Sequence, residues 1–135
     1  MGKLIDRLQD ASRSGVYRAA RAEEIMQAVR ESSLFLARIR FADKETLLKN
    51  IAAALDFPQW FGQNWDALED CLSDLPGKKG YVLLFEEAKP GDDLGVLFDV
   101  LRSSAQSWAA RGKPFFAVFI DPARSLPLAD LFAEK

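Results

Sequence analysis

Two uninterrupted apolar runs constrain the fold of this 135-residue chain more than any other feature. They are YVLLF, within residues 80–87, and FFAVFI, within residues 114–121. A strand with one wet face alternates apolar and polar residues, so a continuously apolar strand must be buried on both faces. Such strands occur in parallel sheets that have helices packed against them, and we therefore expect an α/β fold.

The segments before and between these runs supply the other elements of this core. A β-rich stretch at 33–41 predicts a third strand, and Asp43 is placed to cap a helix over residues 44–56. Residues 94–112 carry the longest helical pattern, which ends at Gly112, where a glycine cap is expected. This order favours a three-stranded parallel sheet with right-handed crossovers and helices packed on it.

Both ends of the chain are expected to add to this core. The first 14 residues predict a frayed helix, GVYRA at 15–19 a short edge strand, and residues 21–31 a further helix. The end of the chain carries two prolines and is expected to have little regular structure beyond a helical turn near Leu128. The predicted parts are an N-terminal extension (1–32), a central domain (33–121) and a C-terminal tail (122–135).

Composition limits the functions that this chain can have. It has no histidine and one cysteine, Cys71, which excludes a Ser-His-Asp triad, a Cys-His pair, a histidine-ligated zinc site and an intrachain disulfide. The sequence has no glycine-rich phosphate loop and no run of about 18 apolar residues that could cross a membrane. Because the N-terminus lacks the apolar core of a signal peptide, we expect a cytoplasmic protein, and nothing indicates a cofactor.

Negative charge is concentrated in the middle of the chain. Residues 56–99 carry three basic and ten acidic side chains, a balance of −7. Residues 1–55 have a balance of +3 and residues 100–135 one of +2, so the net charge of −2 conceals a strongly acidic region. Such a region repels nucleic acid and attracts a basic partner.

Within the acidic region, residues 64–75 form a short helical pattern that Asn64 is placed to cap. At 100° per residue, Cys71 falls at the border of an apolar side formed by Trp65, Leu68, Leu72 and Leu75. The opposite side carries Asp66, Glu69, Asp70, Ser73 and Asp74. Each like-charge i,i+4 pair of aspartates costs about 0.2–0.5 kcal/mol, so this helix gives up stability to concentrate negative charge.

The residues alone leave several interpretations of this acidic side open. The simplest interpretation is a solvated surface, and the more specific interpretation is a surface that binds a cationic partner. The aromatic residues Trp60, Phe61 and Trp65 favour the second, although such rings also pack into ordinary cores. An acid–base pair of Asp66 and Asp70 would need a pocket to split its pKa values, and a Mg²⁺ or Ca²⁺ site would need converging oxygens, so both are less favoured.

The stretch PQWFGQNWDALEDCL resembles the signature of the barstar family, intracellular inhibitors of the secreted ribonuclease barnase. In that family an aromatic pair, a glycine, a polar residue and an asparagine lead into a helix that reads Asp-Ala-Leu-x-Asp-Cys-Leu. The likeness extends over residues 33–121, and the first 30 residues are similar to those of longer bacterial members. It implies a small three-layer fold with a three-stranded parallel sheet plus the N-terminal extension.

The resemblance also implies a function, that of a proteinaceous inhibitor rather than an enzyme. The acidic helix would plug the active site of a basic ribonuclease, as an immunity protein does against a toxin, in a 1:1 complex with a monomer. Asp70 would be the main mimic of an RNA phosphate, Asp66 would pair with a second basic group, and Trp60 would stack on the edge of the catalytic histidine of the enzyme. The implied contact residues are Trp60, Phe61, Gly62, Asn64, Trp65, Asp66, Glu69, Asp70 and Ser73.

Three positions depart from the family pattern. Glu69 stands where the family has a tryptophan, which removes an aromatic contact and adds a charge. Ser107 and Arg111 stand where a late helix of the family supplies acids, and Arg111 would repel a basic enzyme if it faced the contact. The alternative function is therefore a barstar-like binding or regulatory module for a different basic protein.

Overall fold

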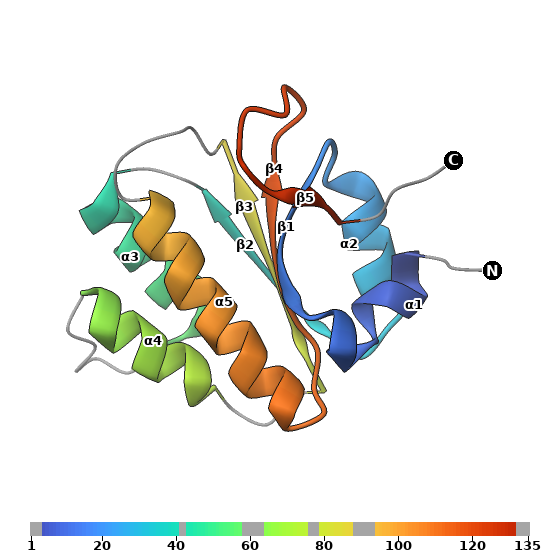
Figure 1. The fold of residues 1–135 in the computed structure, drawn as a ribbon, viewed down its shortest axis with the longest axis horizontal. Helices are drawn as coiled ribbons and strands as arrows, with labels where there is room; N and C mark the ends of the chain where they lie inside the picture. Colours follow the sequence, from blue (N-terminus) through green and yellow to red (C-terminus); the bar gives the residue numbers. More distant parts are fainter. Residues whose placement is uncertain (1–3, 41–42, 58–63, 76–78, 88–93, 132–135) are drawn as a thin grey trace.

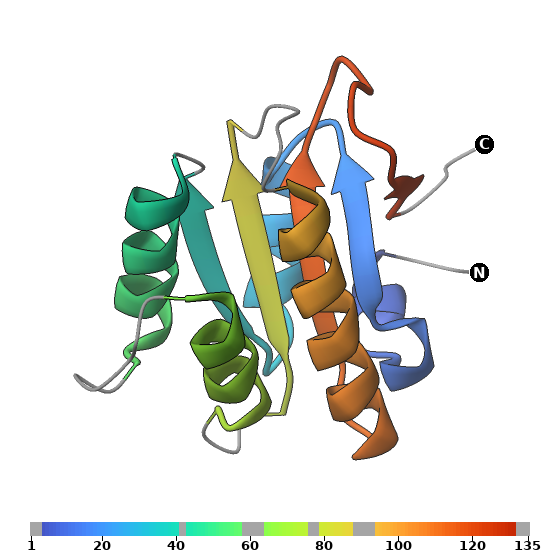
Figure 2. The same ribbon diagram turned by 60° about the vertical axis from the view of Figure 1, so that its left-hand side comes forward.

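The computed structural model describes residues 4–40, 43–57, 64–75, 79–87 and 94–131, and it confirms an α/β fold (Figure 1). One parallel sheet lies between two layers of helices, which Figure 2 shows from the side of α3, α4 and α5. The elements in chain order are α1 (Leu4–Leu8), the 3₁₀ turn η1 (Ala11–Arg13), β1 (Gly15–Ala19), α2 (Glu23–Arg30), β2 (Phe35–Arg40), α3 (Lys44–Leu55), α4 (Trp65–Ser73), β3 (Tyr81–Glu86), α5 (Leu94–Ala110), β4 (Phe115–Ile120) and β5 (Ala129–Asp130).

Five strands form the sheet, in the order β2-β3-β4-β1-β5, and every neighbouring pair is parallel. The three strands expected from the sequence are β2, β3 and β4, which lie side by side. The sheet is larger than the three strands expected for the central domain, because the N-terminal extension adds β1 beside β4 and the tail adds β5 beside β1.

The strand expected at 15–19 is present, but it lies inside the sheet rather than at its edge. β1 pairs with β4 along its whole length and with β5 on its other side. β5 also replaces the helical turn expected near Leu128. The tail lies along β1 because its leucines, Leu126, Leu128 and Leu131, are buried against the molecule.

Both faces of the sheet are covered, as continuously apolar strands require. One core lies under α3, α4 and α5, and the other lies under α1 and α2. Alternate residues of β3 and β4 are fully buried in the two cores: Leu83, Phe85, Ala117 and Phe119 in the first, and Val82, Leu84, Phe116 and Val118 in the second. The N-terminal extension therefore supplies one of the three layers.

Two helix caps predicted from the sequence are confirmed. The Asp43 carboxylate accepts the Thr46 N–H at 2.9 Å, which fixes the start of α3. After α5, Gly112 adopts a φ of 75° and donates its N–H to the Ala109 carbonyl at 2.9 Å. Glycine adopts this left-handed conformation without steric cost. The end of α5 is thereby set, and α5 is the helix against which α4 packs.

Candidate protein-binding site

Helix α4 begins at Asn64, as the sequence predicts. The Asn64 side-chain oxygen accepts the Ala67 N–H at 2.8 Å, and the Asn64 backbone is extended, with φ −135° and ψ 171°. This geometry is that of an N-cap, which satisfies a first-turn N–H that has no partner within the helix. The position of the cap fixes which side chains of α4 turn inward.

The apolar side of α4 is anchored in the core. Leu68 and Leu72 are fully buried, and Leu75, which follows the helix, is nearly so. Trp65 is half-buried against the same core, and Lys44 Nζ lies 5.5 Å from the centre of its ring. The predicted apolar side is confirmed, and it orients the opposite side toward solvent.

Cys71 belongs to the buried side. Burial raises the pKa of its thiol, and the nearby carboxylates of Asp70 and Asp74 raise it further. A thiol is nucleophilic as the thiolate, so these surroundings make Cys71 unreactive. We therefore assign it a packing role as a small apolar residue.

The acidic side of α4 carries three exposed carboxylates, those of Asp66, Asp70 and Asp74. Among the residues that the structure describes, none of the three forms an ion pair. Figure 2 shows α4 on the outer layer beside α5, so these charges lie at the surface of the molecule. Unneutralised carboxylates on one helix face create a negative potential that extends into solvent.

Glu69 is directed toward α5. It is half-buried, and its Oε2 accepts a hydrogen bond from Ser103 Oγ at 2.9 Å. The Glu69 carboxylate is thus held at the junction of α4 and α5. Sequence reasoning did not identify Ser103 as part of this surface, and no local signal marks a contact between residues 34 positions apart.

Arg111 binds the C-terminal end of α4. Its Nη2 donates to the Ser73 carbonyl at 3.0 Å, and its guanidinium lies 4.3 Å from the centre of the Trp108 ring. The Trp108 indole N–H donates to the Leu72 carbonyl at 2.9 Å. The last carbonyls of a helix lack partners within it, and a cation there complements the helix dipole. Arg111, which directly follows α5, therefore supplies a positive charge at the C-terminal end of α4, where α4 has no basic residue of its own.

Six of the nine predicted contact residues lie on α4 or at its start, and the structure brings them together: Asn64, Trp65, Asp66, Glu69, Asp70 and Ser73. The other three, Trp60, Phe61 and Gly62, lie outside the described residues. Asn64 and Ser73 have structural roles at the two ends of the helix, whereas Asp66 and Asp70 are exposed and form no ion pair with another described residue. Their contact with a partner remains a prediction.

The described residues show no arrangement for metal binding, since they contain no group of three or more Cys, Asp or Glu side chains placed to hold an ion. Two pockets lined by described residues lie beside α1 and α2, away from Asp66 and Asp70. In the same residues, no helix is long and apolar enough to cross a membrane. The acidic face of α4 is an exposed, negatively charged surface.

An α/β fold that presents an outward-facing acidic helix offers a surface that a basic protein partner could bind. A comparison with protein families matches residues 32–120 to Barstar (barnase inhibitor). Because this match covers most of the chain, the protein belongs to the barstar family, whose members are inhibitors and not enzymes. Membership implies inhibition of a barnase-type ribonuclease. No curated protein matches the sequence.

Proposed function

We propose that this chain inhibits a basic ribonuclease by placing the acidic face of α4 in the active site of the enzyme. The observation that carries the proposal is the arrangement of Asp66, Asp70 and Asp74, exposed on one face of a helix whose other face is buried. In this complex Asp70 takes the place of an RNA phosphate, and Asp66 pairs with a second basic group. Trp60 stacks on the edge of the catalytic histidine of the enzyme.

The chemistry of a ribonuclease supports this choice of partner. An enzyme that binds a polyanion needs cationic side chains in its active site, and carboxylates form charge-assisted, often bidentate hydrogen bonds with arginine. Helix α4 is held at both ends, by Asn64 and by Arg111, so little conformational entropy is lost when it binds. The negative field also steers the inhibitor toward a basic enzyme.

The biological role that fits this mechanism is immunity. An inhibitor of a secreted ribonuclease protects the cell that makes the enzyme, so the proposed setting is the cytoplasm and the proposed pair is a toxin with its antitoxin. A monomer is sufficient, because a 1:1 plug needs no self-complementary surface. In this proposal the central domain, 33–121, carries the contact, and the extension and tail complete the fold.

Inhibition kinetics test the proposal. We expect competitive inhibition of RNA cleavage by a barnase-type ribonuclease, because α4 and the substrate phosphate occupy one site. The double variant Asp66→Asn/Asp70→Asn should raise the inhibition constant by about 100-fold or more, since two charge-assisted contacts are lost. Inhibition that does not compete with RNA, or that the double variant leaves unchanged, would contradict the proposed plug.

A second candidate is a barstar-like module whose partner is a different basic protein. Glu69 and Arg111 favour it, because they give this surface a different charge pattern from the one that the family resemblance implies. The structure holds Glu69 against Ser103 and Arg111 against the Ser73 carbonyl. This candidate predicts no inhibition of barnase-type enzymes. It also predicts a basic partner that binds the wild-type chain and not the Asp66→Asn/Asp70→Asn variant in a pull-down.

A further inference from the structure

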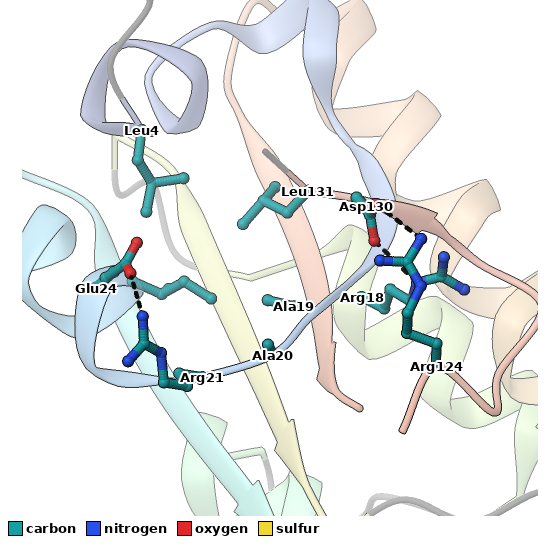
Figure 3. Close-up of a pocket in the computed structure, with 10 residues that line it drawn as sticks. Leu4, Arg18, Ala19, Ala20, Arg21, Glu24, Arg124, Asp130 and Leu131 are labelled. Atoms are coloured by element: carbon teal, nitrogen blue, oxygen red, sulfur yellow. Dashed lines mark hydrogen bonds and ion pairs between the residues drawn. The ribbon is translucent and has the colours of Figure 1, made fainter. Parts of the chain in front are cut away.

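A second site lies beside α2, on the face of the sheet that α4 does not cover. A pocket of about 350 Å³ opens at the carboxyl end of β1, next to the start of α2 (Figure 3). In parallel α/β sheets, the carboxyl ends of the strands are where ligands usually bind. The volume lies at the lower end of the range for small-molecule sites.

The pocket is built by the parts of the chain outside the family match. Its described lining residues come from segments 4–25 and 124–131, whereas the match covers residues 32–120. The extension and the tail therefore create a cavity that the matched segment alone would not have. Because none of its lining belongs to α4, this site is independent of the proposed inhibitor surface.

One wall of the pocket carries two arginines that share a single carboxylate. Arg18 Nε donates to Asp130 Oδ1 at 2.9 Å, and Arg124 Nη2 donates to Asp130 Oδ2 at 3.3 Å. The hydrogen bond from Arg18, aided by the charge of Arg124, holds the pKa of Asp130 below its usual range. Among the residues that line this wall, two guanidinium groups face one ionised carboxylate, and Asp121, which does not line the pocket, also interacts with Arg18.

The opposite wall carries a third arginine. Arg21 Nη2 pairs with Glu24 Oε1 at 3.3 Å, and Figure 3 shows this pair across the pocket from Arg18 and Arg124. Both partners are exposed, and an exposed pair of this kind contributes little stability, so Arg21 can exchange Glu24 for another anion. The helix that starts here has Ala22 at its N-cap, which provides no side-chain acceptor for the first-turn N–H groups.

Small and apolar residues complete the pocket. Ala19 and Ala20 lie between the two charged walls, where a larger side chain would fill the space (Figure 3). Leu4, Ile25 and Leu131 provide an apolar surface beside them. The pocket thus offers cationic donors on two sides and an apolar wall, which suits a ligand with an anionic group and a less polar body.

We propose that this pocket binds a small ligand through a phosphate group held between Arg21 and the Arg18–Arg124 pair. A phosphate monoester carries close to two negative charges near pH 7 and accepts several hydrogen bonds at once. Each guanidinium has five N–H donors, and the described contacts use two of those of Arg18 and one each of Arg21 and Arg124. The remaining donors suffice for a phosphate without dismantling the link between Arg18 and the tail.

Nuclear magnetic resonance titration of the full chain tests this proposal at constant ionic strength. The probes are inorganic phosphate, adenosine 5′-monophosphate and adenosine. We expect saturable shifts of the Ala19, Ala20 and Arg21 amides with the first two probes and none with adenosine. Tighter binding of the nucleotide would assign the site to phosphate esters, and equal binding would assign it to phosphate alone. No saturation of either up to roughly 10 mM, a very weak affinity, would overturn the proposal.

Charge variants distinguish specific phosphate binding in the pocket from non-specific electrostatic attraction to the protein surface. Arg21→Gln/Arg124→Gln should weaken phosphate binding at least about tenfold, as the loss of two charged hydrogen bonds requires. Arg30→Gln is the matched control for the single variant Arg21→Gln, which removes the same charge, because Arg30 is exposed at the other end of α2 and does not line the pocket. An equal loss in the control would overturn the proposal. Melting curves verify that the variants fold, and Arg18 is kept because it ties the tail to β1.

Discussion

Asp121 illustrates how one buried carboxylate organises the end of the chain. It follows β4, is 5% exposed, and accepts hydrogen bonds from the Ser125 N–H at 3.0 Å and the Leu126 N–H at 2.8 Å. Burial alone would raise its pKa, but these hydrogen bonds and the charge of Arg18 together hold the pKa of Asp121 below its usual range. The ionised side chain therefore stabilises the turn that leads the tail back to β1.

This arrangement predicts acid-dependent stability. Because the folded pKa is depressed, the contribution of Asp121 is complete above its unfolded pKa of about 4 and is lost as the pH falls through the lower folded pKa. Asp121→Asn turns an acceptor into a donor beside N–H groups, so we expect a loss of about 1–3 kcal/mol at pH 7. Urea unfolding at pH 7 and pH 3 measures the loss, which should be smaller in acid. A difference that is the same at both pH values would contradict this account.

The N-cap of α4 gives a second prediction for a single residue. Asn64→Ala removes the acceptor of the Ala67 N–H and should lower the free energy of unfolding by about 1 kcal/mol. Asn64→Asp retains an acceptor and is the control, with stability close to that of the wild type. Urea unfolding compares the variants. Equal stability of the alanine and aspartate variants would show that the cap contributes nothing.

Among the elements, the apolar and acidic faces of α4 were predictable from the sequence, but the residues outside α4 that contact it were not. The spacing of its apolar residues and the Asn64 cap are local signals, so both were predicted correctly. The contacts of Glu69 with Ser103 and of Arg111 with Ser73 join residues 34 and 38 positions apart. Such contacts depend on how α4 and α5 pack, which no local pattern records.

Arg111 should stabilise the end of α4. Arg111→Ala removes a cation from the helix C-terminus, for which we expect a cost of about 0.3–1 kcal/mol, together with faster amide exchange at the end of α4. Arg102→Ala is the control, since Arg102 is likewise an exposed arginine but lies within α5 and pairs with Asp99 of the same helix. Hydrogen exchange of both variants tests this role. Unchanged exchange with tighter ribonuclease binding would instead make Arg111 a repulsive residue at the contact.

The strands show the same limit of sequence reasoning. Strands β2, β3 and β4 were predicted from apolar or β-rich runs in the sequence, and β1 was also predicted. Its place inside the sheet was missed because β1 pairs with β4, about 100 residues later, and with β5, which is two residues long. A two-residue strand has no periodicity of its own, and only burial of the neighbouring leucines fixes it.

For the whole molecule, the main consequence is that the N-terminal extension is part of the core. α1 and α2 cover one face of the sheet, and Leu8 and Ile25 are buried there with Val82, Leu84 and Phe116. The chain length and the order of the expected elements predicted a single α/β unit, and the charge distribution predicted its acidic middle. They did not show that one complete layer of it comes from outside the family match.

Removing this layer should prevent stable folding. Deletion of residues 1–31 exposes an apolar sheet face and one edge of β4, so we expect aggregation or loss of cooperative unfolding. Ile25→Ala, which leaves β1 in place, should cost about 2–5 kcal/mol through the cavity that it creates. Thermal unfolding measures both. A truncated chain with the melting temperature of the wild type would show that the extension is dispensable.

Calorimetric titration of the chain into a catalytically inactive barnase-type ribonuclease tests the central claim most directly. Asp70→Ala is compared with Asp6→Ala, which removes the same charge from an exposed position on α1, across the sheet. We expect 1:1 binding that weakens by about 2–5 kcal/mol in Asp70→Ala, a range that rests partly on the barnase–barstar complex itself, and little in Asp6→Ala. No binding, or equal losses in the two variants, would contradict the assignment of the acidic face of α4 as the inhibitory surface.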